Sequence, residues 1–404
     1  MAGVLEGLRI VEGSAFVAAP LGGMTLAQLG ADVIRFDDVR GGIDHDRWPV
    51  APDGTSLFWR GMNKGKRSIA VDLRRPEGRE LVTALIAAPG PDAGLFLTNF
   101  PAAGWLSYER LSAGRDDLIM LSLTGNPDGS TAVDYTINPA TGFPAVTGDG
   151  ARPVNHVLPA WDVAAGLTLA VGLLAAERHR GRTGQGRHVT VSLADVAFAV
   201  MADLGYLAQA QVGGERPALG NDLYGAFGRD FTTADGRRIM VVAITARQWR
   251  SLVAATGIEE YLPVVEKAFG VRLDREGDRY IARDAIGALL APWFAARTAA
   301  EAGAELAAAG VCWGPYQTFA EALEQDPRVS TANPLFADVE HAGLGPLRTP
   351  GSPLVFTGLE RADHLRPPLV GEHTDEILAG VLGLSAREIG GLHDAGVVAS
   401  QVRR

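Results

Sequence analysis

The side chain with the clearest chemical potential is a carboxylate at the start of a long apolar segment. Asp162 follows Pro159 and Trp161, and residues 163–180 are rich in alanine and leucine. This pattern predicts a helix with Asp162 at its N-cap or in its first turn. Free backbone N–H groups and the positive end of the helix dipole would keep a carboxylate there ionised. Capping of a buried helix is the simpler interpretation for an isolated aspartate, so its role depends on what lies beside it.

Small residues follow Asp162, and short apolar strands alternate with helices before it. Ala164, Ala165 and Gly166 would let another backbone or a ligand approach the first turn closely. Strands are expected at 8–12, 32–36, 68–72, 93–98, 117–123 and 187–193, and helices at 20–29 and 76–88. Such alternation gives a parallel sheet with ligands at the carboxyl ends of its strands. We therefore predict an α/β fold of the open, doubly wound kind.

The chain changes character after an apolar helix at 194–210. Residues 213–228 are glycine-rich and loop-like, and 231–243 alternate as a β-hairpin does around the turn Ala234-Asp235-Gly236. Further helices are expected at 247–256 and 284–296. We therefore expect a large domain, a smaller α+β domain and a segment that returns to the large domain. Their predicted bounds are 1–224, 225–320 and 321–404, with a proline-rich, turn-rich crossover at 327–368.

Composition narrows the class of protein. The 404 residues carry a formal net charge of −10, which argues against binding nucleic acid through its phosphates. The N-terminus lacks the basic flank of a signal peptide, and no uninterrupted apolar run approaches the roughly 20 residues of a membrane span. The single Cys312, expected as a buried structural thiol, excludes internal disulfides and fits a reducing compartment. We expect a cytoplasmic protein without nucleic-acid or membrane partners.

The sequence lacks the common signatures of metal and nucleotide cofactors. Its eight histidines are scattered, without an H-E-x-x-H motif. No G-x-G-x-x-G follows the first strand, and there is neither a P-loop lysine nor a G-x-S-x-G elbow. We therefore expect no metal site, and Asp162 becomes the main candidate for chemistry.

Several short motifs, each weak alone, occur in one specific order. They are 16–20, 30–35, 63–68, 72–78, Asn99-Phe100, the segment before Asp162, 183–186 and 371–376. On this ordered set, the chain resembles the class III (formyl-CoA transferase-like) CoA-transferase family nearly from end to end. The resemblance implies a Rossmann-like large domain, built from both chain ends around an open, mainly parallel sheet. It also implies two ring-shaped protomers interlocked as a homodimer.

The resemblance gives Asp162 a chemical role. Family members carry at this position an aspartate that attacks an acyl-CoA thioester, which releases CoA thiolate and leaves a mixed anhydride. The thiolate can then attack the aspartyl carbonyl, so that CoA becomes bound to the enzyme and a carboxylate leaves. This cycle needs an ionised aspartate, donors for developing oxyanions and exclusion of water. A helix N-terminus would meet the first two needs, and the loop 213–228 is a candidate for the third.

Within the family, the chain resembles members that move CoA between the two carboxyl groups of one unsaturated C5 diacid, mesaconate. The stretches that carry this likeness are 11–20, 99–108, 155–162 and 223–230. The donor acid would become its own acceptor after turning over in the closed site. Its free carboxylate would need a cation or hydrogen-bond donors, and Arg47, His156 and Arg229 are candidates. Each of the three could equally be a structural or solvated side chain.

The family resemblance also implies which residues contact CoA. They are Phe16, Val17 and Ala18 through their backbone, then Val71, Arg74, Asn99, Phe100 and Asp134 or Tyr135. The guanidinium of Arg74 suits the nucleotide phosphates, although it could instead be a surface side chain. Asp37-Asp38 place acid where some relatives carry a base for CoA. No cofactor is implied beyond the CoA moiety of the substrate.

Three alternatives stay open. α-Methylacyl-CoA racemases share the aspartate but pair it with the histidine of a G-H-D segment, where this chain has Ala132-Val133-Asp134. An intermolecular CoA-transferase with a separate acceptor acid would use the same Asp162 chemistry. A non-enzymatic binding module predicts that Asp162→Ala changes nothing.

Overall fold

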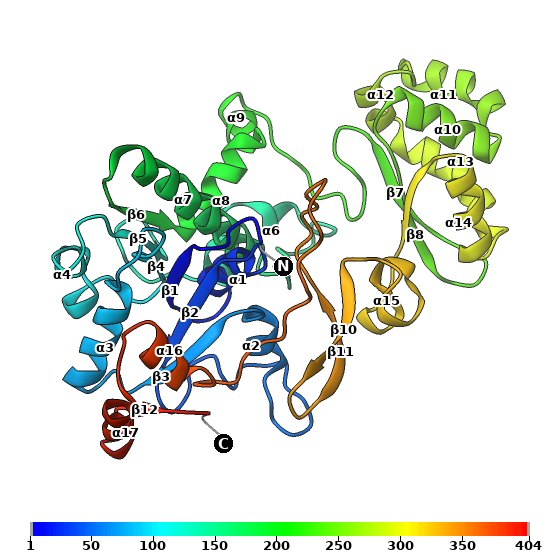
Figure 1. The fold of residues 1–404 in the computed structure, drawn as a ribbon. Coiled ribbons are helices and arrows are strands. Elements are labelled where there is room, and N and C mark those ends of the chain that lie inside the picture. Colours follow the sequence, from blue (N-terminus) through cyan, green and yellow to red (C-terminus); the bar gives the residue numbers. More distant parts are fainter. Residues whose placement is uncertain (1–2, 402–404) are drawn as a thin grey trace. The chain divides into compact units, whose positions relative to one another are not determined.

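Parallel strands with helices between them form the N-terminal half of the chain in the computed structural model, which describes residues 3–401 (Figure 1). One sheet has the strand order β12-β3-β2-β1-β4-β5-β6. Its strands are β1 (Arg9–Gly13), β2 (Asp32–Asp37), β3 (Arg67–Val71), β4 (Leu95–Thr98), β5 (Ile119–Thr124), β6 (Arg187–Ser192) and β12 (Val398–Ala399). All neighbours are parallel except β12, which runs antiparallel to β3. The predicted α/β fold with an open, mainly parallel sheet is confirmed.

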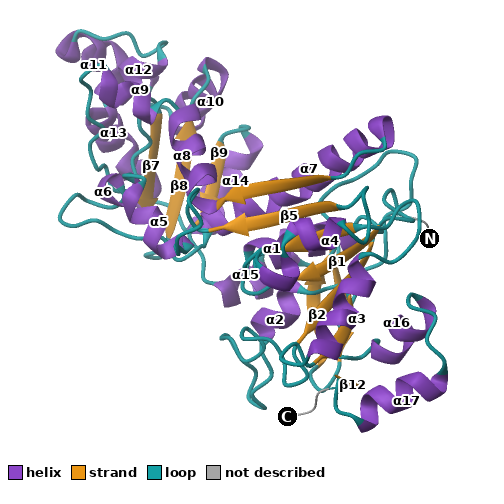
Figure 2. Cartoon of the chain, turned by 90° about the vertical axis from the view of Figure 1, so that its left-hand side faces the viewer, coloured by secondary structure: helices purple, strands orange, loops and turns teal. Residues whose placement is uncertain are grey.

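Successive side chains of the strands pack on opposite faces of this sheet. Ile10 and Leu97 belong to one hydrophobic core, and their neighbours Val11 and Phe96 belong to the other. The first face is covered by α1 (Ala18–Ala27) and α7 (Ala160–Thr183), and the second by α3 (Pro76–Ile86), α16 (Thr374–Gly380) and α17 (Ala386–Asp394). Because both faces are buried, the strands are continuous apolar runs in the sequence. Figure 2 shows α16 and α17 beside β12, so the end of the chain completes the sheet that its start begins.

The chain divides into two compact units. The first comprises residues up to 141, 156–213 and 327 onwards, and the second comprises 142–155 and 214–326. These bounds differ from the predicted divisions after 224 and 320, because 142–155, 214–224 and 321–326 join the second unit. The first unit also holds α2 (Leu57–Met62), η1 (Gly104–Leu106), α4 (Tyr108–Ser112), α5 (Asp134–Ala140), α8 (Leu193–Asp203), α9 (Tyr206–Gln211), η3 (Pro327–Val329), β10 (Phe336–His341) and β11 (Gly345–Pro350).

The second unit is built on a three-stranded antiparallel sheet of order β7-β8-β9. Its strands are β7 (Phe227–Thr232), β8 (Arg238–Ala243) and β9 (Cys312–Pro315). Its helices are α6 (Phe143–Val146), α10 (Ala246–Thr256), η2 (Glu259–Tyr261), α11 (Leu262–Phe269), α12 (Glu276–Ile281), α13 (Arg283–Ala295), α14 (Ala299–Ala308) and α15 (Phe319–Gln325). Strands β7 and β8 form the predicted hairpin, and Phe227, Trp249 and Leu290 lie in the core beside it.

Two local predictions are wrong, those for 194–210 and Cys312, and the crossover at 327–368 holds a hairpin that was not predicted. The helix expected at 194–210 is interrupted at Gly205, whose positive φ of 84° ends α8 and starts α9. The tract 327–368 contains a regular hairpin, β10–β11. Cys312 is exposed rather than buried. It lies on the edge strand β9 next to Trp313, which packs against the hydrophobic core, and alternation along the strand therefore turns the thiol outward.

Helix α7 is the central element of the first unit. Among the described residues, it alone is long and apolar enough to cross a membrane by length and composition. A core helix passes the same test, and Leu169 and Leu173 are fully buried in the core that α7 shares with α1. A Cβ added to Gly166 would stand 2.6 Å from the carbonyl oxygen of Ala18, so the two backbones nearly touch. The predicted close approach after Asp162 is confirmed, and its partner is the first residue of α1.

Gly166→Ala should therefore destabilise the protein by about 1–3 kcal/mol, because one helix has to move to admit the methyl group. The matched control is Gly181→Ala near the end of the same helix, where an added Cβ meets nothing within 4 Å. That substitution should be neutral or stabilise by up to about 1 kcal/mol through helix propensity. Urea denaturation measures both changes, and equal effects would contradict a close contact that is specific to Gly166.

Candidate active site

The strand order reverses beside β1, which has β2 on one side and β4 on the other. In open α/β sheets, ligands bind outside the carboxyl ends of the strands at such a reversal. The loops after β1 and β4 meet there. The Asn99 side chain accepts a hydrogen bond from the N–H of Ala15 at 2.9 Å and donates one to its carbonyl oxygen at 2.8 Å. Two predicted CoA-binding stretches, 16–18 and 99–100, are thus adjacent.

Phe16 adopts a strained backbone conformation in this loop. Its φ of 68° lies in the left-handed region, which residues with a side chain rarely adopt. Its N–H donates to Oδ2 of Asp44 at 2.9 Å. The guanidinium of Arg47 lies over the Phe16 ring, 5.2 Å from its centre, and over the Phe58 ring at 5.1 Å. Strain that is held by surrounding contacts is typical of ligand sites.

Asp44 belongs to a buried network of charges centred on Arg35. The Arg35 guanidinium donates to Asp37 at 2.9 Å and to Asp44 at 3.1 Å, and all three side chains are about 1% exposed. Burial opposes the charge of Arg35, but Asp37 and Asp44 outweigh it and raise the pKa of Arg35 above its usual value. The position of Asp44, and with it the Phe16 loop, therefore depends on Arg35.

The same network continues to β1 and α1 through Lys66. Arg35 and Lys66 share the side-chain oxygen of Asn63, at 3.1 and 2.9 Å. Lys66 also donates to Glu12 at 2.7 Å and to the carbonyl oxygen of Pro20 at 2.9 Å. Burial lowers the pKa of Lys66 to about 8, against the attraction of Glu12. The network thereby ties the ends of β1 and β2 to the first helix.

The helix start that carries Asp162 is capped by a different carboxylate. Asp134, the first residue of α5, accepts the N–H of Trp161 at 2.8 Å and the N–H of Asp162 at 3.1 Å on one oxygen. Its other oxygen is hydrogen-bonded to Nε2 of His156 at 2.9 Å. Asp162 does lie in the first turn of α7, as predicted. The expectation that its own carboxylate takes the free N–H groups is wrong.

The electrostatics of Asp162 differ accordingly from those of a capping residue. Burial raises the pKa of Asp162, the negative charge of Asp134 raises it further, and Arg47 opposes both. The resulting pKa is about 6. Asp162 is therefore ionised at neutral pH and is more basic than an ordinary aspartate, a combination that suits a nucleophile.

The other predicted CoA contacts also follow the carboxyl ends of strands. Val71 ends β3 with its side chain fully buried, and Phe100 packs edge-on against Phe36 with ring centres 6.1 Å apart. The exposed Arg74 makes two hydrogen bonds of 2.8 Å with Asp72. The hydroxyl of Tyr135 donates to the carbonyl oxygen of Val157 at 3.3 Å. The side chain of Asp134, by contrast, is buried against α7.

Arg40, which lies near Arg74, is a further basic residue at this edge that is absent from the predicted set. Asp38 accepts a hydrogen bond from Arg40 at 2.7 Å, while Asp37 is buried under Arg35. Arg74 is close enough to Arg40 to counteract part of the rise in the Arg40 pKa that Asp38 causes. The overlooked signal is an Asp-x-Arg spacing after β2, repeated as Asp72-x-Arg74 after the adjacent β3. Asp38 is therefore paired with the exposed guanidinium of Arg40, so this position still offers a base.

The three candidates for a substrate carboxylate have different surroundings. His156 is engaged with Asp134. Arg229 belongs to the second unit and is bonded to Asp222 and Asp284, each at 2.6 Å. Within residues 3–401, the guanidinium of Arg47 makes no ion pair and is bounded by aromatic rings. Arg47 is therefore the cation that a substrate could pair with at no cost to an existing bond.

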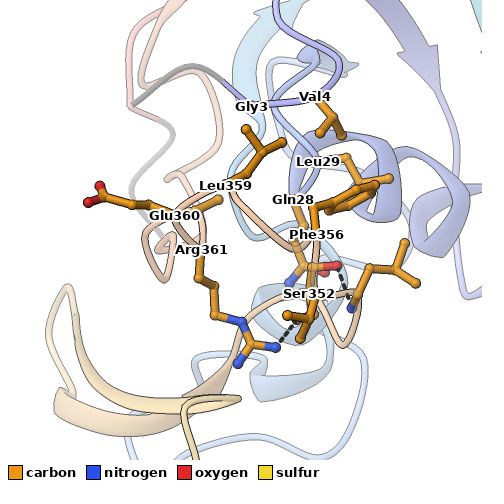
Figure 3. A pocket seen from close by; sticks show the side chains of 12 residues that line it. Gly3, Val4, Gln28, Leu29, Ser352, Phe356, Leu359, Glu360 and Arg361 are labelled. Atoms are coloured by element: carbon orange, nitrogen blue, oxygen red, sulfur yellow. Dashed lines mark hydrogen bonds between the residues drawn. The ribbon is translucent and has the colours of Figure 1, made fainter.

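A metal site and the small cavity beside α1 would be two other places where a ligand could bind in the first unit. In the described part of the chain, no group of three or more His, Cys, Asp or Glu side chains is placed to hold a metal ion. A small cavity of about 60 Å³ lies beside α1. Figure 3 shows side chains that line it, among them Val4, Leu29 and Phe356, and the hydrogen bond that Arg361 donates to the carbonyl oxygen of Ser352. The predicted site residues do not line it.

Comparison with known proteins agrees with this geometry. Residues 5–374 match the model of CoA-transferase family III. The chain belongs to this family. It is 57% identical to a 2-methylfumaryl-CoA isomerase from Chloroflexus aurantiacus over the full length of both proteins. It is 29% identical to a succinyl-CoA:mesaconate CoA-transferase from Haloarcula marismortui, covering 94% of this chain and 97% of the relative.

Solved structures give the same assignment. A CaiB/BaiF family protein from Brucella suis superposes with a TM-score of 0.78 at 28% identity, covering 94% of this chain and 100% of the other. The predicted family and enzyme class are thus confirmed, and a CoA-transferase of family III acts on an acyl-CoA substrate. The roles of individual site residues stay predictions.

Arg35→Met should destabilise the protein by about 3–5 kcal/mol, because Asp37 and Asp44 would lose the cation that compensates their burial. The matched control is Arg40→Met, which removes the exposed guanidinium paired with Asp38. It should leave the free energy of unfolding essentially unchanged, because solvent screens an exposed pair. Chemical denaturation compares the two, and a small loss for Arg35→Met would mean that the network does not hold this part of the fold.

Proposed function

We propose that this chain is a 2-methylfumaryl-CoA isomerase, which converts mesaconyl-C1-CoA to mesaconyl-C4-CoA with Asp162 as nucleophile. The observation that carries the proposal is the 57% identity, over the full length of both chains, to a relative of that name. The raised pKa of Asp162 at the start of α7 supports its role as nucleophile.

The reaction proceeds by four exchanges at carbonyl carbons. The Asp162 carboxylate attacks the C1 thioester, the C–S bond breaks, and CoA thiolate leaves behind a mixed anhydride. The thiolate attacks the aspartyl carbonyl and releases the diacid as a dianion. After the diacid turns, its C4 carboxylate attacks the aspartyl-CoA thioester and expels the thiolate. A final attack of the thiolate at C4 gives the isomeric CoA ester and restores the Asp162 carboxylate.

Arg47 holds the carboxylate that is not reacting. Its guanidinium lies over the Phe16 and Phe58 rings and is coupled electrostatically to Asp162. It has no ion pair in the described structure, whereas His156 and Arg229 are already bonded to aspartates. A substrate that carries a charge at each end can turn over and still present one carboxylate to the same cation.

CoA binds along the carboxyl ends of the strands. The backbone of Phe16, Val17 and Ala18 lies beside the acyl group, next to Asn99 and Phe100. Arg74 and the neighbouring Arg40 bind the nucleotide phosphates, with Tyr135 as a further contact. Val71, the last residue of β3, is fully buried and supports this edge of the sheet from inside the core. The enzyme needs no cofactor beyond the CoA moiety.

We further propose that the protein forms an interlocked homodimer in the cytoplasm, without nucleic-acid or membrane partners. The net charge of −10 disfavours binding to phosphate backbones. Helices α7, α8 and α9 expose apolar side chains that a second copy would cover. They include Leu167, Val171, Phe198 and Leu207.

An intermolecular CoA-transferase is the second candidate. The 29% identity to a succinyl-CoA:mesaconate CoA-transferase along nearly the whole chain favours it. The two candidates share the Asp162 chemistry and differ in whether a separate acid must enter.

Incubation with mesaconyl-C1-CoA, without added acid, should produce the C4 ester, separated by chromatography of the CoA esters. Asp162→Ala should abolish the product, while Asp116→Ala, an exposed aspartate before β5, should not affect it. Product that forms only after a free acid is added would replace the isomerase with the intermolecular transferase. Full activity of Asp162→Ala would exclude both.

Arg47→Met should lower kcat/KM for mesaconyl-C1-CoA by about 30-fold, since a charge pair with the free carboxylate is worth roughly 2 kcal/mol or more. The inhibition constant of 2-methylcrotonyl-CoA, which has a methyl group in place of that carboxylate, should stay unchanged. Arg110→Met, an exposed position on α4, is the control variant. Equal weakening of the substrate and the methyl analogue would mean that Arg47 acts only on packing or on CoA.

A further inference from the structure

Two carboxylates lie at the start of α7, and only one of them is stabilised as an anion. Asp134 is 1% exposed, and its two oxygens accept hydrogen bonds from the Trp161 N–H, the Asp162 N–H and His156. In the described structure, the Asp162 carboxylate accepts no hydrogen bond, although it is part of the same helix turn. The positive end of the helix is therefore used by Asp134.

We propose that Asp134 is a positioning residue which takes up the free N–H groups of α7 and thereby keeps the Asp162 carboxylate basic and unbound. This inference rests on the proposed role of Asp162 as nucleophile. It replaces the predicted contact of Asp134 with CoA, because the buried carboxylate is fully engaged with the helix.

The charge changes of the reaction explain why this arrangement helps. When Asp162 attacks the C1 thioester, its negative charge leaves the carboxylate and appears on the CoA thiolate, while Asp134 stays charged. Repulsion between the two carboxylates is thus present before the attack and relieved in the anhydride and the aspartyl thioester. If Asp162 held the N–H groups itself, its anion would be stabilised and its attack would be slower.

His156 and Trp161 fix Asp134 in this role. The Nε2 of His156 carries its hydrogen toward Asp134, which only accepts, and this bond stabilises the Asp134 anion. The Trp161 indole donates to Asn138 at 2.9 Å, one turn further along α5, so α5 and α7 are joined at two points. The charged and titratable groups that face Asp162 are then Asp134 from α5, His156 through Asp134, and Arg47 from the loop after β2.

Asp134→Asn removes the negative charge of residue 134 but keeps the helix cap, because an amide oxygen can still accept hydrogen bonds from the two N–H groups of α7. In the wild-type protein, kcat/KM should fall below an apparent pKa of about 6, where Asp162 becomes protonated. In Asp134→Asn, this acid limb should move down by about one pH unit, since the like charge is gone. At pH 8, kcat should fall by about threefold, because a less basic nucleophile reacts more slowly. Asp116→Asn, an exposed position before β5, should change neither quantity.

His156→Ala provides the opposite shift and does not depend on the fold tolerating a change at Asp134. Without this donor, the Asp134 carboxylate loses a hydrogen bond and shares a proton with Asp162 more readily, so the acid limb should move to higher pH. The pKa of Asp162 can also be read without substrate, from the infrared carboxyl band that Asp162→Asn lacks. A purely structural cap predicts loss of stability with the acid limb unmoved in both variants, and that result would overturn the inference.

Different results would contradict the proposed function and the positioning role of Asp134. If Asp162→Asn keeps activity, Asp162 is not the nucleophile, whatever Asp134 does. If Asp162→Asn is inactive while the acid limb and the infrared titration are the same in wild type and Asp134→Asn, the nucleophile stands and only the positioning role of Asp134 is wrong.

Discussion

The carboxyl edge of the large sheet depends on one interaction, in which the Arg35 guanidinium binds two buried carboxylates at once. Arg35 lies at the end of β2 and is bonded to Asp37 of its own strand and to Asp44 of the following loop. Buried charges are costly to desolvate, so such a network adds little net stability while it disfavours other arrangements. Its main effect is geometric, because Asp44 can bond the N–H of Phe16 only while Arg35 holds it. The left-handed backbone at Phe16 costs on the order of 1–2 kcal/mol and persists because these contacts determine it.

The site joins parts of the chain that are distant in sequence through two different kinds of contact. Polar contacts join the strand ends, as Asn99 does with Ala15. Steric fit joins the helices, since Gly166 lets α7 approach the start of α1 at Ala18. Together they bring the turn that carries Asp162 next to the loop after β1. Cores on both faces of the sheet leave these loops little freedom to separate.

Local pattern was enough to predict β1 to β6 and the helix that carries Asp162, but it predicted neither the short β12 nor how the charges pair. Strands of a doubly covered sheet are apolar throughout, and small residues after Asp162 indicated close packing correctly. Asp37 and Asp44 resemble surface acids in the sequence, and only folding brings them to Arg35. The exposure of Cys312 likewise depends on which face of β9 Trp313 occupies. The sequence predicts that Asp162 accepts hydrogen bonds from the free N–H groups of α7, because nothing in it shows that Asp134 reaches the start of this helix.

The misassigned cap matters because two opposing effects act on a carboxylate at a helix start. The N–H groups and the dipole lower its pKa, while burial and a neighbouring carboxylate raise it. At Asp162 the second pair prevails, since Asp134 has taken the hydrogen bonds, and the pKa of Asp162 rises to about 6. At pH 7 this leaves about ten ionised molecules for each protonated one, so almost no nucleophile is lost. A much higher pKa would remove the anion at neutral pH, and a normal one would leave it less reactive. Because Asp134 rather than Asp162 binds the N–H groups at the positive end of the α7 dipole, the Asp162 carboxylate is both charged and reactive.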